Sequence, residues 1–478
     1  MPRQIFHLRP QGWENDPDEE QIPLSTLDYL PPALYNNYAL FFRLHDTDKP
    51  RMAALLKAGL ERTLSQARHL CGTVERDPST GDHFFVRRRD STVQFHVQWL
   101  DSDRDASHPS FCELEAHNFS SLKLGDIRLW SVAPMTHGVK PEANIDMSPA
   151  ASAFKANFIR GGLVFNMHMH HCSNDVMGWA AFTHQLAENC SAFHLGDETS
   201  YPPWDPACLD RSRLISKEAV PEEFKVDAPA PGPPHPQLLP VEPLLFHLPK
   251  SKAAKLKALA TPPDGSASST FPSWISTFDA FSAFIWRTLL RIRAEVFKPE
   301  PSMSLDWMTP VDMRRRLDNP PCSPRMQGNV FVIARSTATA QFVADSPLWE
   351  VAAFVRQTIA ASGTQAALDK RLNAVATIRD KTRLSLRADT LSPLALLVTD
   401  WRATDIAAAD FGLAAPAAFR HVSDHVTRCV VQVYPPRAPK SKPKDEGCEF
   451  TITFEKGLSR ALIEDAEWSE FFEYRGIV

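Results

Sequence analysis

The run His170–His171–Cys172–Ser173–Asn174–Asp175 contains the side chains of this sequence that are best suited to acid–base chemistry. It follows an apolar stretch, residues 162–169, and directly precedes a helix-like segment, residues 176–182. Imidazole suits a general base because its pKa lies close to neutral pH. A carboxylate four residues after a histidine can hold the local turn or pair with a distant cation. The pattern therefore predicts a general base at the end of a strand, held by a structural acid.

A metal site is the first alternative, and its candidate ligands are His168, His170, His171 and Asp175. The spacing His-x-His on a strand places two imidazoles on one face, as zinc enzymes require. No further pair of histidines or cysteines completes such a site elsewhere in the sequence. We therefore expect no bound metal.

Cys172 could instead be a nucleophile. It directly follows the candidate base, and residues adjacent in sequence on a strand-to-helix turn rarely point at each other. We expect a buried or half-buried thiol. The eight cysteines form no C-x-x-C pair, which argues against a structural zinc site or a disulfide framework.

A second motif, Asp410–Phe411–Gly412, follows the segment Thr399–Asp400–Trp401–Arg402. Asp-Phe-Gly alone is typical of protein kinases, but neither a His-Arg-Asp loop nor a glycine-rich phosphate loop accompanies it. Gly412 could simply supply a turn conformation that other residues avoid. The motif does not identify a chemistry by itself.

Three successive arginines, Arg314–Arg315–Arg316, follow a plausible strand at residues 304–308. Such a run is typical of a solvated face, but the preceding strand allows at least one side chain to point inward. A buried arginine needs a carboxylate partner. Asp175 is the carboxylate that still lacks a cation.

These motifs must be positioned by two domains, because 478 residues exceed one ordinary core. Prolines concentrate in residues 201–250, which we interpret as an extended linker between residues 1–200 and residues 251–478. Both halves mix helical and strand patterns. The sequence therefore predicts a mixed α/β fold.

Local patterns predict individual elements. Residues 52–69 have apolar side chains at helical spacing, and residues 93–99 alternate as a half-buried strand. Ser276 and Asp279 form a capping-box pattern before the apolar helix 280–290. A final helix is expected over residues 458–472.

Composition excludes several classes of partner. Apolar residues make up 43% and charged residues 23%, and the net charge is −5, with no segment that concentrates lysine or arginine. We expect no nucleic-acid or membrane partner. The first residues have no apolar signal core, and no run reaches the roughly 18 apolar residues of a spanning helix. We expect a cytoplasmic location.

Taken together, these motifs resemble the BAHD-type acyltransferases, in particular the fungal branch that includes trichothecene 3-O-acetyltransferase. His170–His171-x-x-x-Asp175, the Asp-x-Arg-x-Arg element at 312–316 with Gly328–Asn329, and Asp410–Phe411–Gly412 occur in the family's order. Supporting matches are Leu24–Ser25–Thr26–Leu27–Asp28, Ser276–Thr277–Phe278–Asp279–Ala280 and Glu464–Asp465–Ala466–Glu467–Trp468.

The resemblance implies two chloramphenicol-acetyltransferase-like domains, each a mixed sheet with flanking helices, joined by a long crossover and separated by a solvent channel. It implies that His171 takes a proton from a substrate hydroxyl or amine, which attacks an acyl-CoA, with acetyl-CoA expected. Asp175 would pair with Arg314, and Trp401 or a nearby backbone amide would bind the oxyanion. The other implied substrate or CoA contacts are His170, Thr399, Asp410, Phe411 and Gly412.

The resemblance further implies a monomer with no permanently bound cofactor, a small-molecule acceptor and an acyl-CoA donor. The sequence departs from the family at three positions: Val176 and Ala414 replace glycines, and Asp400 replaces a serine. We expect a fungal secondary metabolite to be acylated. The alternatives are a stand-alone condensation or cyclisation enzyme that uses the same histidine, and a non-catalytic binding protein.

Overall fold

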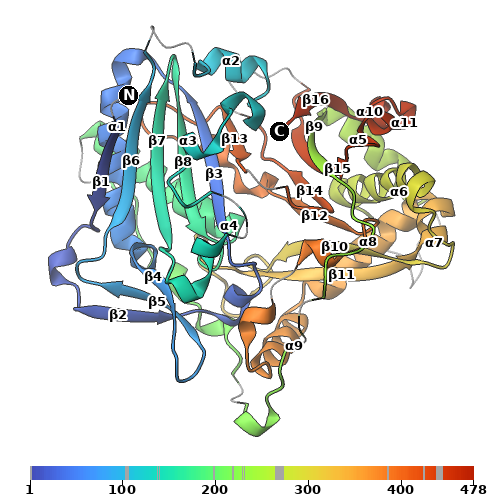
Figure 1. Ribbon diagram of the computed structural model, residues 1–478, viewed down its shortest axis with the longest axis horizontal. Coiled ribbons are helices and arrows are strands. Elements are labelled where there is room, and N and C mark those ends of the chain that lie inside the picture. Colours follow the sequence, from blue (N-terminus) through green and yellow to red (C-terminus); the bar gives the residue numbers. More distant parts are fainter. Residues whose placement is uncertain are drawn as a thin grey trace.

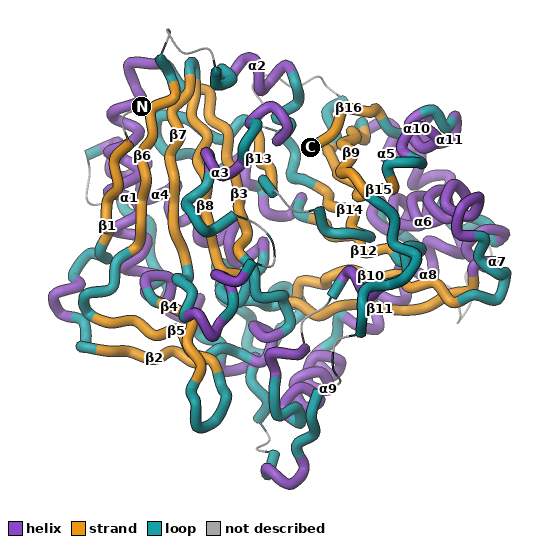
Figure 2. Tube along the Cα trace, viewed as in Figure 1, coloured by secondary structure: helices purple, strands orange, loops and turns teal. Residues whose placement is uncertain are grey.

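A computed structural model gives the arrangement of the elements (Figure 1). It describes residues 3–102, 107–136, 138, 140–196, 200–217, 220–228, 230, 232–263, 274–384, 387–423, 426–437 and 445–478. Two large sheets lie side by side, and helices flank both of them (Figure 2). This arrangement confirms the predicted mixed α/β fold.

The first sheet has six strands in the order β1-β6-β7-β8-β3-β13. Their bounds are β1 Arg3–Leu8, β6 Val93–Leu100, β7 Ser152–Ile159, β8 Gly162–His170, β3 Tyr35–Arg43 and β13 Ala418–His421. All neighbouring strands are antiparallel except β6 and β7. Helices α1 (Lys49–Gln66) and α4 (Val176–Leu195) pack together against one face of this sheet.

The second sheet has seven strands in the order β11-β10-β12-β14-β15-β9-β16. Their bounds are β11 Phe331–Thr339, β10 Ser304–Asp312, β12 Leu396–Asp400, β14 Val430–Val433, β15 Cys448–Glu455, β9 Val241–Leu248 and β16 Glu473–Ile477. Helices α6 (Thr277–Phe297) and α8 (Leu348–Ser362) cover its apolar face. The capping box predicted for α6 is present.

A small sheet and short helices complete the chain. The small sheet pairs β2 Glu19–Pro23, β5 His83–Arg88 and β4 Thr73–Arg76. The remaining helices are α2 Phe111–Ala116, α3 Ile127–Trp130, α5 Lys250–Leu259, α7 Ala340–Asp345, α9 Gln365–Ala376, α10 Ser459–Ile463 and α11 Ala466–Phe471. In the part of the chain that is described, no helix is long and apolar enough to cross a bilayer.

Three elements differ from the sequence-based expectations. Residues 201–250, expected to be a linker throughout, include strand β9, because its apolar residues pair with β15 and β16. The expected final helix is two short helices, α10 and α11. Strand β13 lies beyond residue 250 but is the edge strand of the first sheet. The second half of the chain therefore contributes one strand to the first sheet.

Candidate active site

His171 lies immediately after the last residue of β8, where the strand leaves the first sheet. Its backbone N–H donates to the carbonyl of Leu34, 2.9 Å away, and so continues the pairing with β3. Its side chain is partly exposed, whereas His170 and Cys172 on either side are buried. The sheet thus leaves this one imidazole of the motif accessible.

His168 and His170 face the other side of the sheet, because side chains alternate along a strand. The Nε2 of His168 accepts a hydrogen bond from the backbone N–H of Val132. The Nε2–H of His170 donates to the carbonyl of Ala143 at 2.9 Å, and its Nδ1 accepts from the thiol of Cys172 at 2.8 Å.

Both ring nitrogens of His170 are therefore already engaged within the protein, so neither is free for the contact with substrate or CoA that was expected of this residue. Burial lowers the pKa of His170 to about 4 and that of His168 to about 3, so both rings are neutral at pH 7. Cys172 is also buried, and burial raises the pKa of its thiol. A neutral buried thiol is a poor nucleophile.

Burial also lowers the pKa of His171 below its ordinary value. The shift is opposed by backbone groups of His171 and Asn174 and by the negative charge of Asp175. The ring is consequently neutral at pH 7, which is the state that can accept a proton.

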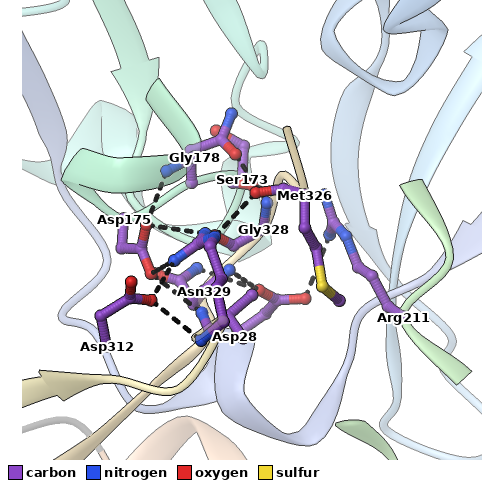
Figure 3. Close-up of polar contacts among 12 residues, drawn as sticks. Asp28, Ser173, Asp175, Gly178, Arg211, Asp312, Met326, Gly328 and Asn329 are labelled. Carbon is purple, nitrogen blue, oxygen red and sulfur yellow. Dashed lines mark hydrogen bonds and ion pairs between the residues drawn. The ribbon is translucent and has the colours of Figure 1, made fainter. Parts of the chain in front are cut away.

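Asp175 is the N-cap of α4 and every acceptor direction of its carboxylate is used (Figure 3). Oδ1 accepts from the N–H of Gly178 at 2.8 Å and Oδ2 from the N–H of Val330 at 2.9 Å. Arg314 donates to both oxygens at 3.0 Å. Burial favours the neutral form of Arg314, but Asp175 and Asp312 outweigh it and raise its pKa. The expected contact between Asp175 and Arg314 is therefore present, and it joins the loop that contains His171 to the loop after β10.

Asn329 fixes the backbone of the histidine motif from the other half of the chain. Its Nδ2 donates to the carbonyls of His171 at 3.0 Å and Cys172 at 3.1 Å, and to Asp28 at 2.9 Å. The residue is fully buried. The amide thereby sets the position from which the His171 side chain projects.

Asp28 and Arg211 complete this buried network, in which Figure 3 labels both residues. Arg211, from the proline-rich segment, donates to Asp28 at 3.1 Å and to the carbonyl of Ser173 at 3.3 Å. Asp28 and Asn329 belong to segments that carried the family resemblance, but no sequence signal indicated their contact. Arg211 had no signal at all.

Gly178 permits two backbones to approach each other at the start of α4. A Cβ at this position would lie 2.8 Å from the carbonyl oxygen of Gly328 and would also overlap the side chain of Asn174. Asn174 in turn accepts a hydrogen bond from the N–H of Gly328 at 2.7 Å. The close approach of Asn174 and Gly328 thus explains why position 178 is a glycine.

Trp401 is nearly buried and packs against Tyr38 and His421, with ring centroids 5.9 and 5.6 Å away. Its indole N–H donates to the hydroxyl of Thr399 at 2.9 Å. The expected oxyanion donor is therefore already engaged. Thr399 accepts this bond and keeps its own hydroxyl hydrogen for another acceptor.

Asp410, Phe411 and Gly412 lie at the opposite end of α4 from Asp175. Gly412 has a φ of 88°, and a Cβ there would lie 2.7 Å from the Cβ of His194 in the last turn of α4. At a rise of 1.5 Å per residue, α4 places its last turn about 27 Å from its N-cap, Asp175. Phe411 is buried in the core, and Asp410 accepts from the N–H of Gly412. The structure does not bring this motif to His171, and it gives the motif a turn-forming role.

Two cavities flank the histidine motif. One, of about 360 Å³, adjoins Met177 of α4 and includes Arg315, Arg316 and Arg356. The other, of about 290 Å³, adjoins His170 and Cys172. His171 is partly exposed and adjoins in sequence two residues that border the second cavity, but it lines neither cavity itself.

Comparison with known proteins gives a consistent result. A profile described as "Transferase family" matches residues 120–467, and one described as "Trichothecene 3-O-acetyltransferase-like N-terminal domain" matches residues 34–190. The sequence is 57% identical to acetyltransferase FGR3 of Gibberella zeae, an alignment that covers 100% of this chain and 95% of that protein.

More distant similarities cover the whole chain. Trichothecene 3-O-acetyltransferase TRI101 of Fusarium sporotrichioides is 25% identical over 95% of this chain and 97% of that protein. The crystal structure of F. graminearum TRI101 complexed with coenzyme A and deoxynivalenol aligns with a TM-score of 0.72 at 21% identity. That alignment covers 96% of this chain and 100% of the other and supports a common fold.

Proposed function

The chain belongs to the transferase family, and on this premise we propose that it is an acetyl-CoA-dependent O-acetyltransferase that acts on a fungal secondary metabolite. The acetyltransferase from Gibberella zeae and the coenzyme A in the aligned complex support this donor. The observation that carries the proposal is the placement of His171: neutral, partly exposed and held by a buried network at the end of β8.

The larger cavity suits the donor. Its lining includes Arg315, Arg316 and Arg356, which can bind the phosphates of a CoA thioester. It also includes three aspartates that are each already paired with an arginine, Asp279, Asp312 and Asp400. The cavity also borders Ser276, the N-cap of α6, where the helix N-terminus favours negative charge. Met177 places the same cavity beside the first turn of α4, next to the catalytic loop. We infer that the thioester reaches His171 from this side.

His171 is the general base of the proposed reaction. Its ring removes the proton of the acceptor hydroxyl as the oxygen attacks the thioester carbonyl. A C–O bond forms, the tetrahedral intermediate collapses, and the C–S bond breaks. The imidazolium then returns the proton to the leaving thiolate, which gives free CoA and the acetate ester. Asp175 does not take part in proton transfer, because its oxygens are occupied by Arg314 and by two backbone N–H groups.

Thr399 is the oxyanion donor in this proposal. Trp401 donates to its Oγ1, which orients the hydroxyl and leaves its hydrogen available. A donor that is held in place before the reaction stabilises developing charge without reorganisation. The predicted role of Trp401 is thereby changed from a direct contact to a positioning contact.

The test is acetyl transfer from acetyl-CoA by purified protein, measured as release of free CoA with deoxynivalenol and a panel of hydroxylated fungal terpenoids and polyketides. The wild type is expected to turn over at least one acceptor, and His171→Ala is expected to lose two to four orders of magnitude, about 10²–10⁴-fold, in kcat. His45→Ala, at an exposed histidine distant in sequence from the motif, is the matched control. Equal turnover by His171→Ala and the wild type would refute the proposal.

A further inference from the structure

The second sheet presents a polar row toward the first sheet. Thr399 on β12 is paired with Gln432 on β14, and Gln432 with Thr451 on β15. Paired residues project from the same face of a sheet. Leu245, the partner of Thr451 on β9, packs in the core of the first sheet. This polar row therefore lies on the face that looks across to the other half of the molecule.

A crevice of about 80 Å³ lies between this row and β13. Twelve residues line it: Ser121, Pro243, His421, Ser423, Val426, Thr427, Val430, Gln432, Tyr434, Thr451, Thr453 and Val478. None of these side chains is a carboxylate, a guanidinium or an amine. The composition suits an uncharged ligand that forms hydrogen bonds.

Two amide groups, Gln432 in the crevice lining and Asn36 in contact with the lining residue His421, carry a hydrogen-bond donor that no described residue satisfies. The Nε2 of Gln432 is buried and has no partner among the described residues. The same holds for the Nδ2 of Asn36, a residue that is only 4% exposed. A buried donor without a partner costs stability, because it has lost its hydrogen bonds to water and gained none in return. Two of them at one crevice indicate a ligand that supplies the acceptors.

Asn36 links the crevice to the catalytic histidine. Its Oδ1 is 3.2 Å from the Nε2 of His421, which lines the crevice. Asn36 is paired with Met169 on β8, two residues before His171, so Asn36 and His171 project from the same face of adjacent strands. Trp401 packs against His421 of β13 and donates a hydrogen bond to Thr399 of β12, so it contacts both the first and the second sheet.

We propose that this crevice is the acceptor subsite, in which Gln432 and Asn36 donate hydrogen bonds to oxygen atoms of an uncharged, oxygen-rich acceptor. This inference rests on the proposed acetyltransferase function. The crevice is too small for a whole metabolite, so it holds the end of the acceptor that carries carbonyl, ether or hydroxyl oxygens. That end is then oriented so that the reacting hydroxyl faces His171. Among the described lining residues, a cationic acceptor finds no carboxylate side chain, and a carboxylated acceptor finds only the imidazole of His421.

The test uses deoxynivalenol as the probe, in the presence of free CoA, and measures its binding by calorimetry. Gln432→Leu and Asn36→Leu keep approximate size and remove the donor. Each is expected to weaken binding at least tenfold while CoA affinity stays the same. Gln341→Leu, at an exposed glutamine of α7, is the matched control and is expected to bind as the wild type does.

Folding stability supplies a second readout that needs no acceptor. Gln432→Leu removes an unsatisfied buried donor and is expected to leave the Tm unchanged or to raise it, whereas removal of a purely structural amide would lower it. Asn36→Ser, which keeps a donor, is expected to recover part of the binding that Asn36→Leu loses.

The outcomes separate this inference from the proposed function. Binding that is lost in both variants, without acetyl transfer by the wild type, refutes the acetyltransferase and retains the crevice as a ligand site, but no longer as an acceptor subsite. Acetyl transfer to any acceptor that is equally fast in Gln432→Leu and Asn36→Leu overturns the subsite and retains the acetyltransferase. Failure of the wild type to bind the probe overturns the acceptor class inferred here.

Discussion

Asp175 and Arg314 form a two-point ion pair that joins the loop containing His171, after β8 of the first sheet, to the loop after β10 of the second. The two side chains are 10% and 8% exposed, and both nitrogen–oxygen distances are 3.0 Å. Because two backbone N–H groups also donate to Asp175, the carboxylate is satisfied without contacting a substrate. The pair therefore connects the two halves of the chain close to Asn329, whose side chain donates to the backbone of His171.

Removal of one partner is expected to leave a buried charge uncompensated. Asp175→Asn should lower the free energy of unfolding by about 3 kcal/mol and reduce kcat as well. Urea unfolding followed by fluorescence measures the first effect. The double variant Asp175→Asn/Arg314→Met should lose less than the sum of the single variants, because the uncompensated cation is then absent.

Asp306→Asn is the control for this pair, because Asp306 contacts Arg335 on the surface, where the arginine side chain is 55% exposed. Its effect should stay below about 1 kcal/mol. Additive losses in the double variant would show that Asp175 and Arg314 stabilise the fold independently.

The pH dependence of kcat/KM should report the titration of His171. Burial lowers the pKa of this ring, and the base works only when it is neutral. The rate should therefore rise with pH, reach half of its plateau below pH 6.5, where the ring loses its proton, and stay constant through neutrality.

Asp175→Asn should move this acidic limb to lower pH. The negative charge of Asp175 raises the pKa of His171, so its removal lowers that pKa further. A stopped-time CoA-release assay between pH 4.5 and 8 measures the shift. A limb that moves to higher pH would contradict the electrostatic contribution of Asp175.

Thr399 and Trp401 should differ in their effects on turnover. Thr399→Val removes the proposed oxyanion donor and should lower kcat by about 10²–10³-fold with little change in KM. Trp401→Phe removes only the bond that orients the hydroxyl, so we expect a smaller loss of about tenfold. Steady-state kinetics with acetyl-CoA measures both.

Thr337→Val, on the exposed part of β11, controls for loss of a threonine hydroxyl in a strand. If kcat falls further in Trp401→Phe than in Thr399→Val, the indole N–H of Trp401 is the oxyanion donor and Thr399 is not.

Gly178→Ala should disturb the junction between α4 and the loop that contains Gly328. The added methyl group would lie 2.8 Å from the carbonyl of Gly328, so the backbones must separate. We expect a loss of about 1–3 kcal/mol in stability and a lower kcat, since that loop also positions Asn329. Gly457→Ala, with no atom within 4 Å of the new Cβ, is the control. Thermal denaturation with parallel kinetics distinguishes a local effect from general misfolding, and an unchanged Tm would show that the junction can relax.

Local sequence determined much of the framework of this protein. The strand that ends at His170, the helix that starts after Asp175 and the capping box of α6 follow from side-chain periodicity and capping chemistry, which act over a few residues. The contact between Asp175 and Arg314 could also be predicted from the sequence, because the resemblance to the acyltransferase family implied it. These features depend on neighbours in the chain or on a shared pattern.

Tertiary structure alone decided which distant surfaces meet. Gln432 alternates with valines, a pattern that predicts a strand with one polar face, but it does not tell whether that face meets water or another sheet. The sequence likewise did not predict which residues Asn36 and Arg211 contact, or that Asn329 contacts Asp28. The family resemblance placed Asp410–Phe411–Gly412 at the substrate, but in the structure these residues lie at the far end of α4 from His171. Strand pairing and sheet packing depend on the edges and faces of whole elements, and no local pattern encodes which edge another strand will join.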